Sequence, residues 1–166
     1  MKKTITLIIA LLASISMYAQ APIAVGQSQF NAGIGLSSWG VPVYVGFDYG
    51  VHPDITLGAE ASFRSYRNNW SNRRYNHSII GISGNANYHL NRILDIPSNW
   101  DLYAGLNIGF YIWNSPDGYE GTRSSGLGVA AQVGGRYYFS EKFGLNLEFG
   151  GGNAFSGGKF GISIKL

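Results

Sequence analysis

Apolar residues alternate with small or polar residues through almost the whole chain from Phe30 onward. A period of two places successive side chains on opposite faces of a β-strand, and no helical period of comparable length intervenes. Ile79 is a local violation of the alternation in the fourth row. The pattern therefore predicts eight strands, each with one apolar face. The apolar rows are Phe30, Ala32, Ile34, Leu36; Val43, Val45, Phe47, Tyr49; Ile55, Leu57, Ala59, Ala61, Phe63; Ile80, Ile82, Ala86, Tyr88, Leu90; Leu102, Ala104, Leu106, Ile108, Phe110, Ile112; Leu127, Val129, Ala131, Val133, Tyr137, Phe139; Leu145, Leu147, Phe149; and Phe160, Ile162, Ile164, Leu166.

The opposite face of these rows carries glycines among a few large polar residues, as in the run Gly144, Asn146, Glu148, Gly150. Glycine weakens a strand and packs nothing, so it suits a cramped, curved interior better than a water-facing surface. Charged residues form only 13% of the chain, whereas a water-soluble surface needs about 25 to 35%. The apolar face therefore points outward into lipid, and the fold class is all-β, an eight-stranded antiparallel up-and-down transmembrane β-barrel.

The connections between the rows differ in length on the two sides of the predicted barrel. One side has compact links at residues 50–54, 91–99 and 140–143, and the other has longer loops at 37–42, 65–77, 114–125 and 151–158. Short turns on one side and long loops outside the cell are typical of transmembrane barrels. Aromatic residues near the strand ends predict two interfacial girdles. They are Tyr49, Tyr88, Trp100, Tyr137 and Phe139 on the short-turn side, and Trp39, Phe63 and Trp113 on the other.

The chain begins with Lys2 and Lys3, a short apolar run at residues 5–17 and a small residue, Ala19, before Gln20. This order is typical of a secretory signal peptide, so we expect a signal at 1–19 and one barrel domain at 20–166. The run is too short and polar for a membrane-spanning helix. Removing two of the twelve basic residues leaves ten against nine acidic ones, a net charge of +1. Export and this balance argue against nucleic acid as a partner.

The hairpin RYYFSEKFGLNLEFGGG and the final stretch KFGISIKL carry the most specific resemblance to a known family. With them, the mature chain resembles the small eight-stranded outer-membrane barrels of Gram-negative bacteria, the OmpA/OmpX type. The resemblance implies an outer-membrane anchor that presents surface loops. We also expect a monomer whose partners are outer-membrane lipids and lipopolysaccharide. The resemblance also implies that the assembly machinery reads the last strand, although members commonly end on an aromatic residue and this chain ends on Leu166.

Charged residues on the inward rows predict a buried network. Arg136, Glu148 and Lys159 lie on three successive strands, and buried charges persist only when they are paired. We expect Asp48, Glu60 and Arg64 to complete the network from the opposite wall, as a structural element. Eight strands leave room for side chains only, so an open aqueous channel is not expected.

The stretch RSYRNNWSNRRYNH at residues 64–77 is rich in arginine and aromatic residues and contains no acid. In the second outside loop these residues would meet phosphate groups, which the guanidinium fork matches well. We predict contact with lipopolysaccharide or host polyanions. The alternative is a solvated loop that binds nothing. The residues for contact are Arg67, Trp70, Arg73, Arg74 and Tyr75.

The sequence offers little support for catalysis. None of the histidines His52, His77 and His89 has a serine two residues away, and His77 and Ser78 would face opposite sides of a strand. Three scattered histidines and no cysteine give no metal-ligand spacing. We therefore expect no enzyme, no cofactor and no metal. Three alternatives stay open: a lipid A-modifying enzyme with a cross-strand triad, a narrow pore, and a soluble lipocalin-like binder of small ligands.

Overall fold

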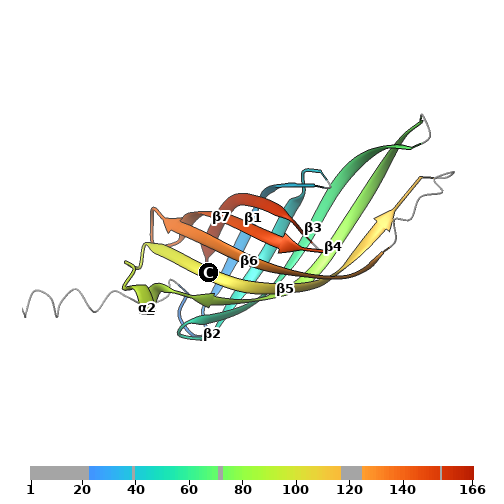
Figure 1. Ribbon diagram of the computed structural model, residues 1–166. Helices are drawn as coiled ribbons and strands as arrows, with labels where there is room; N and C mark the ends of the chain where they lie inside the picture. Colours follow the sequence, from blue (N-terminus) through green and yellow to red (C-terminus); the bar gives the residue numbers. More distant parts are fainter. Residues whose placement is uncertain (1–22, 39, 71–72, 117–124, 154) are drawn as a thin grey trace, which may run out of the picture.

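The computed structural model describes residues 23–38, 40–70, 73–116, 125–153 and 155–166. They form a closed barrel in which each strand pairs antiparallel with the next and β8 pairs with β1 (Figure 1). The predicted fold class is confirmed. The elements are β1 (Ser28–Ser37), β2 (Val43–His52), β3 (Ile55–Trp70), β4 (Arg73–His89), the short helix α2 (Asn91–Leu94), β5 (Trp100–Asn114), β6 (Gly126–Tyr138), β7 (Phe143–Gly152) and β8 (Gly157–Lys165).

The barrel is apolar on its outside and polar within. Most of the large apolar side chains on the outer rows are exposed, with exposed fractions that run from 37% for Phe30 to 71% for Leu36. The interior instead buries asparagine, glutamine, aspartate, arginine and histidine side chains, of which Arg64 is the largest fully buried one. A lipocalin-like barrel needs an apolar interior, so this alternative is wrong. In the described part of the chain, no helix has the length and hydropathy needed to cross a membrane.

Glycines allow close approach at the seam that closes the barrel. Gly33 of β1 lies opposite Gly161 of β8. A Cβ on Gly161 would lie 2.2 Å from the carbonyl oxygen of Ala32, and one on Gly33 would lie 2.2 Å from that of Phe160. Both contacts are with backbone atoms, which cannot move aside as a flexible side chain does. The seam therefore requires glycine on both strands.

The two ends of the barrel differ in how far their strands extend. We call the end with the β2–β3, β4–β5 and β6–β7 connections the turn end, and the opposite end the loop end. Helix α2 lies at the turn end, and β3, β4 and β5 run past the other strands at the loop end (Figure 1). The ends differ in how far the strands project rather than in the length of every connection, because residues 90–99 join β4 to β5 at the turn end whereas only residues 71–72 separate β3 from β4 at the loop end.

The prediction of a loop at residues 65–77 is wrong. The ladder between β3 and β4 continues to the pair Trp70 and Arg73, so most of this stretch forms a projecting hairpin. Its polar residues resemble a loop in sequence because beyond the lipid both faces of a strand can meet water. Rings on the inner face hold it together: Tyr66, His77 and Trp113 lie with centroids 6.2 to 6.3 Å apart.

At the turn end, the predicted girdle residues Trp100 and Tyr137 lie exposed on the outer face with ring centroids 4.7 Å apart. Trp113 is not a girdle residue, because it lies half-buried against the cluster of Ile79, Tyr111 and Ala130. Ile79 also belongs to this inward-facing cluster and is fully buried, which explains why it interrupts the apolar alternation of the outer face. Trp39 and the expected signal peptide at 1–19 lie outside the described residues, and both remain predictions.

Candidate functional site

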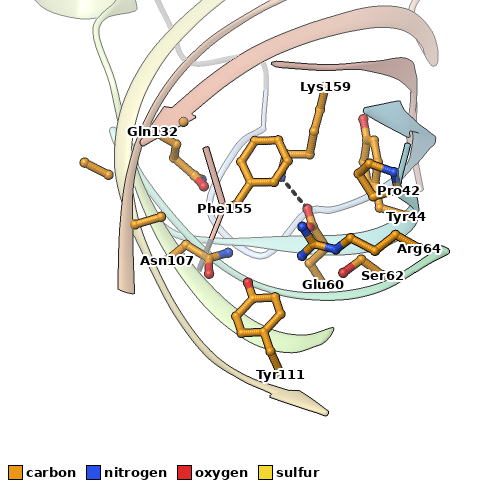
Figure 2. A pocket seen from close by; sticks show the side chains of 13 residues that line it. Pro42, Tyr44, Glu60, Ser62, Arg64, Asn107, Tyr111, Gln132, Phe155 and Lys159 are labelled. Carbon is orange, nitrogen blue, oxygen red and sulfur yellow. Dashed lines mark hydrogen bonds and ion pairs between the residues drawn. The ribbon is translucent and has the colours of Figure 1, made fainter. Parts of the chain in front are cut away.

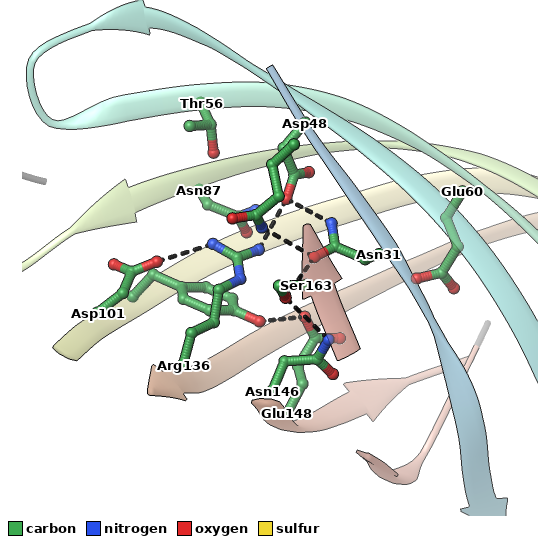
Figure 3. A network of polar contacts seen from close by, with 12 residues as sticks. Asn31, Asp48, Thr56, Glu60, Asn87, Asp101, Arg136, Asn146, Glu148 and Ser163 are labelled. Atoms are coloured by element: carbon green, nitrogen blue, oxygen red, sulfur yellow. Dashed lines mark hydrogen bonds and ion pairs between the residues drawn. The ribbon is translucent and has the colours of Figure 1, made fainter. Parts of the chain in front are cut away.

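Arg136 of β6 is the centre of a buried network near the turn end (Figure 3). Its Nη2 lies 2.7 Å from Asp48 Oδ2 and its Nη1 lies 2.8 Å from Asp101 Oδ2. The guanidinium also lies 4.3 Å from the centroid of the Tyr103 ring. Only 3% of the Arg136 side chain is exposed. Two carboxylates and an aromatic face therefore replace water around one cation.

Asp101 also contacts His89, which completes a row that sequence reasoning missed. His89 Nδ1 lies 2.6 Å from Asp101 Oδ1, and its Nε2 lies 3.0 Å from Thr56 Oγ1. The order acid, histidine, hydroxyl is that of a hydrolase triad. Here all three side chains are almost completely buried, and Arg136 occupies the second carboxylate oxygen. The arrangement therefore fits a structural role, since only 1% of Thr56 is exposed.

Lys159 of β8 forms a second buried centre, nearer the loop end. Its Nζ lies 2.8 Å from Glu60 Oε2 and 2.6 Å from Glu148 Oε1. Tyr103 donates from its hydroxyl to Glu148 Oε2 at 2.9 Å. Because the ring of Tyr103 also contacts Arg136, it links the two centres.

The structure thus brings most of the expected interior residues together. Glu148 and Lys159 pair directly, whereas Arg136 contacts Tyr103, which donates to Glu148. Asp48 and Glu60 join from the opposite wall, as expected. Arg64 lies close to the second centre, because it lines one small cavity together with Glu60 and Lys159. Its Nη1 lies 3.4 Å from Ser37 Oγ and its guanidinium lies 5.6 Å from the Tyr111 ring centroid.

A small cavity lies beside Lys159 in the half of the barrel toward the loop end (Figure 2). Tyr44, Glu60, Arg64 and Tyr111 line it together with Phe155 from the β7–β8 connection. Its volume is about 20 Å³, close to the space that one water molecule needs. A second hollow beside Arg136 has the same volume. The described interior is therefore filled by side chains, as expected for eight strands.

The residues predicted to contact polyanions lie in the projecting hairpin. Arg67 is exposed and stands opposite Asn76, and Tyr75 of β4 is half-buried. Trp70 and Arg73 form the last described pair of the ladder, and Arg74 pairs with Asn69. The side chains of Trp70, Arg73 and Arg74 lie outside the described residues. The backbone therefore places all five positions beyond the body of the barrel at the loop end.

His77 forms a contact that a search along one strand does not find. Its Nδ1 lies 2.9 Å from the hydroxyl of Ser115, which follows β5. A serine and histidine pair is one part of a nucleophilic site. His77 is buried, however, and its ring lies against Tyr66 and Trp113. These ring contacts support a packing role in the base of the hairpin.

Among the described residues, no group of three or more histidine, cysteine, aspartate or glutamate side chains is placed to hold a metal ion.

Fold and interior together define a small transmembrane barrel of the outer-membrane type. The chain belongs to the family described as outer membrane protein beta-barrel domain, whose model matches residues 7–163. No curated protein sequence matches it.

Solved structures show the same fold at low identity. The outer membrane protein OprG from Pseudomonas aeruginosa is 9% identical, with a TM-score of 0.65 over 88% of this chain and 99% of that chain. The N-terminal beta-barrel domain of Pseudomonas aeruginosa OprF is 15% identical, with a TM-score of 0.59 over 86% and 98%. Ail, the attachment invasion locus protein of Yersinia pestis, in complex with the heparin analogue sucrose octasulfate, is 14% identical, with a TM-score of 0.52 over 86% and 99%.

Proposed function

We propose that the protein is a non-enzymatic, monomeric anchor in the outer membrane of a Gram-negative bacterium, which presents its loop end outside the cell. Residues 1–19 direct export, and the assembly machinery then inserts the barrel. The family and the projection of β3 and β4 beyond the other strands at the loop end support this orientation. The filled interior supports an anchor rather than a pore.

The purified protein is expected to give no discrete conductance steps in planar lipid bilayers. The ion pairs of Arg136 and Lys159 cross the lumen, and the two hollows beside them are each about 20 Å³. Hydrated ions need a continuous aqueous path, which an eight-stranded barrel filled by side chains does not provide. Reproducible steps at neutral pH from the heat-modifiable, folded protein would contradict the closed lumen.

The projecting hairpin is the proposed binding element, and its ligands are clustered phosphate or sulfate groups. The observation that carries this proposal is the continuation of the ladder to Trp70 and Arg73, which raises three arginine positions beyond the barrel body. An ordered hairpin holds these positions in fixed register, so less conformational entropy is lost on binding than with a mobile loop. Guanidinium groups bind phosphate and sulfate oxygens in a bidentate manner. The arginines are Arg67, Arg73 and Arg74.

Replacing the three arginines by glutamine is expected to weaken binding of polyanions by about tenfold, because exposed charge contacts contribute about 0.2 to 1 kcal/mol each. Binding is measured in parallel to purified lipopolysaccharide and to heparin, a sulfated probe chosen because Ail was solved with a heparin analogue. The matched control is Lys142→Gln, which removes an exposed cation from the β6–β7 turn at the opposite end.

Comparing the two ligands distinguishes a bacterial lipopolysaccharide from a host polyanion as the natural binding partner. Loss of lipopolysaccharide binding alone assigns the hairpin to the bacterium's own surface, and loss of heparin binding alone assigns it to a host polyanion. If the triple variant binds both ligands as strongly as wild type does, the proposal is wrong and the hairpin is a solvated projection.

A further inference from the structure

A hollow of about 430 Å³ lies on the outer face of the barrel, across β5 to β8. It centres on Gly135 of β6, whose position in the alternation points outward. Its register neighbours are Leu102 of β5 and Leu147 of β7. Every other wall residue facing lipid is a large apolar one. The wall is formed by Leu102, Val133, Tyr137, Leu147, Phe149 and Phe160.

The interior does not require the glycine that opens this hollow. A Cβ on the adjacent Gly134 would lie 2.3 Å from Cζ of Tyr103, so the inward packing explains that residue. A Cβ on Gly135 would lie 3.2 Å from Cδ2 of Leu102 and 3.7 Å from the nearest backbone oxygen. A small shift of one leucine side chain would accommodate it. Nothing else in the described contacts of Gly135 excludes a side chain. Packing within the protein therefore does not explain why this position is a glycine.

The hollow lies at a defined depth in the lipid. Trp100 and Tyr137 form its edge toward the turn end, and their rings pack against each other on the outer face. Paired aromatic residues at a strand end mark the boundary between acyl chains and headgroups. The hollow is therefore continuous with the lipid-facing surface and opens into the leaflet at the turn end, just inside its headgroups.

We propose that the hollow binds one acyl chain of a phospholipid from that leaflet. Its volume lies in the range of small-ligand sites, about 300 to 1,000 Å³, and its wall is apolar. A flexible chain can fill an irregular groove, whereas a gap left in the lipid would lose contacts on one side. Lys142, exposed in the turn of the same β6–β7 hairpin, has Glu141 beside it, so the apolar chain rather than the headgroup charge dominates recognition.

The test compares Gly135→Leu, which fills the hollow, with Gly84→Leu. Gly84 also faces outward in mid-strand, and a Cβ there would meet only a backbone oxygen at 3.7 Å. Each full chain is folded into vesicles of palmitoyl-oleoyl phosphatidylethanolamine and phosphatidylglycerol, extracted in mild detergent and examined by native mass spectrometry. Wild type and Gly84→Leu are expected to retain one phospholipid. For Gly135→Leu, the fraction of protein with a bound phospholipid is expected to fall by more than about tenfold, because the leucine displaces several methylene groups of the acyl chain.

Heat-modifiable migration on a gel confirms that each variant is folded before it is compared. Should Gly135→Leu fail this criterion, Gly135→Val is compared instead, and the same loss is required of it. Equal retention by the hollow-filling variant and wild type, or no lipid on wild type, overturns the proposal. A wild-type dimer that Gly135→Leu abolishes also overturns it, because the occupant is then a second copy of the chain.

Discussion

The Arg136→Met variant is expected to lose about 3 to 5 kcal/mol of unfolding free energy, the usual effect of removing one partner from a buried ion pair. Methionine keeps most of the length of the side chain, so the cavity left behind is small. The change removes the cation between Asp48 and Asp101, which lie 2.7 and 2.8 Å from its guanidinium nitrogens. The two carboxylates then stay buried with no positive partner between them.

Equilibrium unfolding in urea, with the protein in detergent or lipid vesicles, measures this loss as a lower midpoint at similar slope. Lys142→Met is the control, because it removes an exposed cation at the turn end. The triple variant Arg136→Met, Asp48→Asn, Asp101→Asn is expected to recover much of the stability, since it removes the uncompensated charges as well. Wild-type stability for Arg136→Met alone would show that water already reaches this part of the interior.

The architecture was accessible from the sequence because its signal is local. Phe47 and Asp48 are neighbours in the chain, yet one must meet lipid and the other must not, and the period of two records this choice on every strand. Lipid on the outside permits no exception there. Ile79 breaks the predicted alternation because we expected apolar residues on the outer face alone. The structure instead buries Ile79 inside the barrel.

Partner choice inside the barrel was not accessible in the same way. Arg136 and Asp48 are 88 residues apart, and Thr56 and His89 are 33 apart. Which of them meet depends on the tilt of the strands and the stagger of the register around the barrel, neither of which alternation reveals. Arg64 illustrates the difference: its inward direction was predicted, but its contacts with Ser37 and Tyr111 were not.

The projecting hairpin shows where the sequence signal itself ends. Alternation identifies a strand only while its two faces meet different surroundings, and beyond the lipid that contrast fades for residues such as Arg67 and Asn69. The inner face still carries a signal in the spacing of Tyr111 and Trp113, which places both rings inside. Trp113 lies two residues after Tyr111 and therefore on the same, inward face of the strand. This alternation, rather than its position near a strand end, indicates that Trp113 packs at the base of the hairpin.

The Gly161→Val variant is expected to prevent stable closure of the barrel, because its first and last strands meet at this residue. The new side chain would start 2.2 Å from the carbonyl oxygen of Ala32 and 2.7 Å from the hydroxyl of Tyr44. That hydroxyl donates to Asn146 Oδ1 at 2.7 Å, so relief of the clash also breaks a buried hydrogen bond. Overpacking usually costs about 1 to 3 kcal/mol and occasionally more, and a backbone clash lies at the upper end.

The measurement is the fraction of heat-modifiable protein after refolding into detergent, compared between unboiled and boiled samples. Gly84→Val is the matched control, since it adds the same side chain to an outward glycine with only one backbone oxygen within 4 Å, at 3.7 Å. It should refold as wild type does, while Gly161→Val should migrate mostly as the unfolded form. Equal refolding of the two valine variants would mean that β1 and β8 can separate without loss of the barrel. The seam would then be a flexible joint, and its paired glycines would need a reason other than closure.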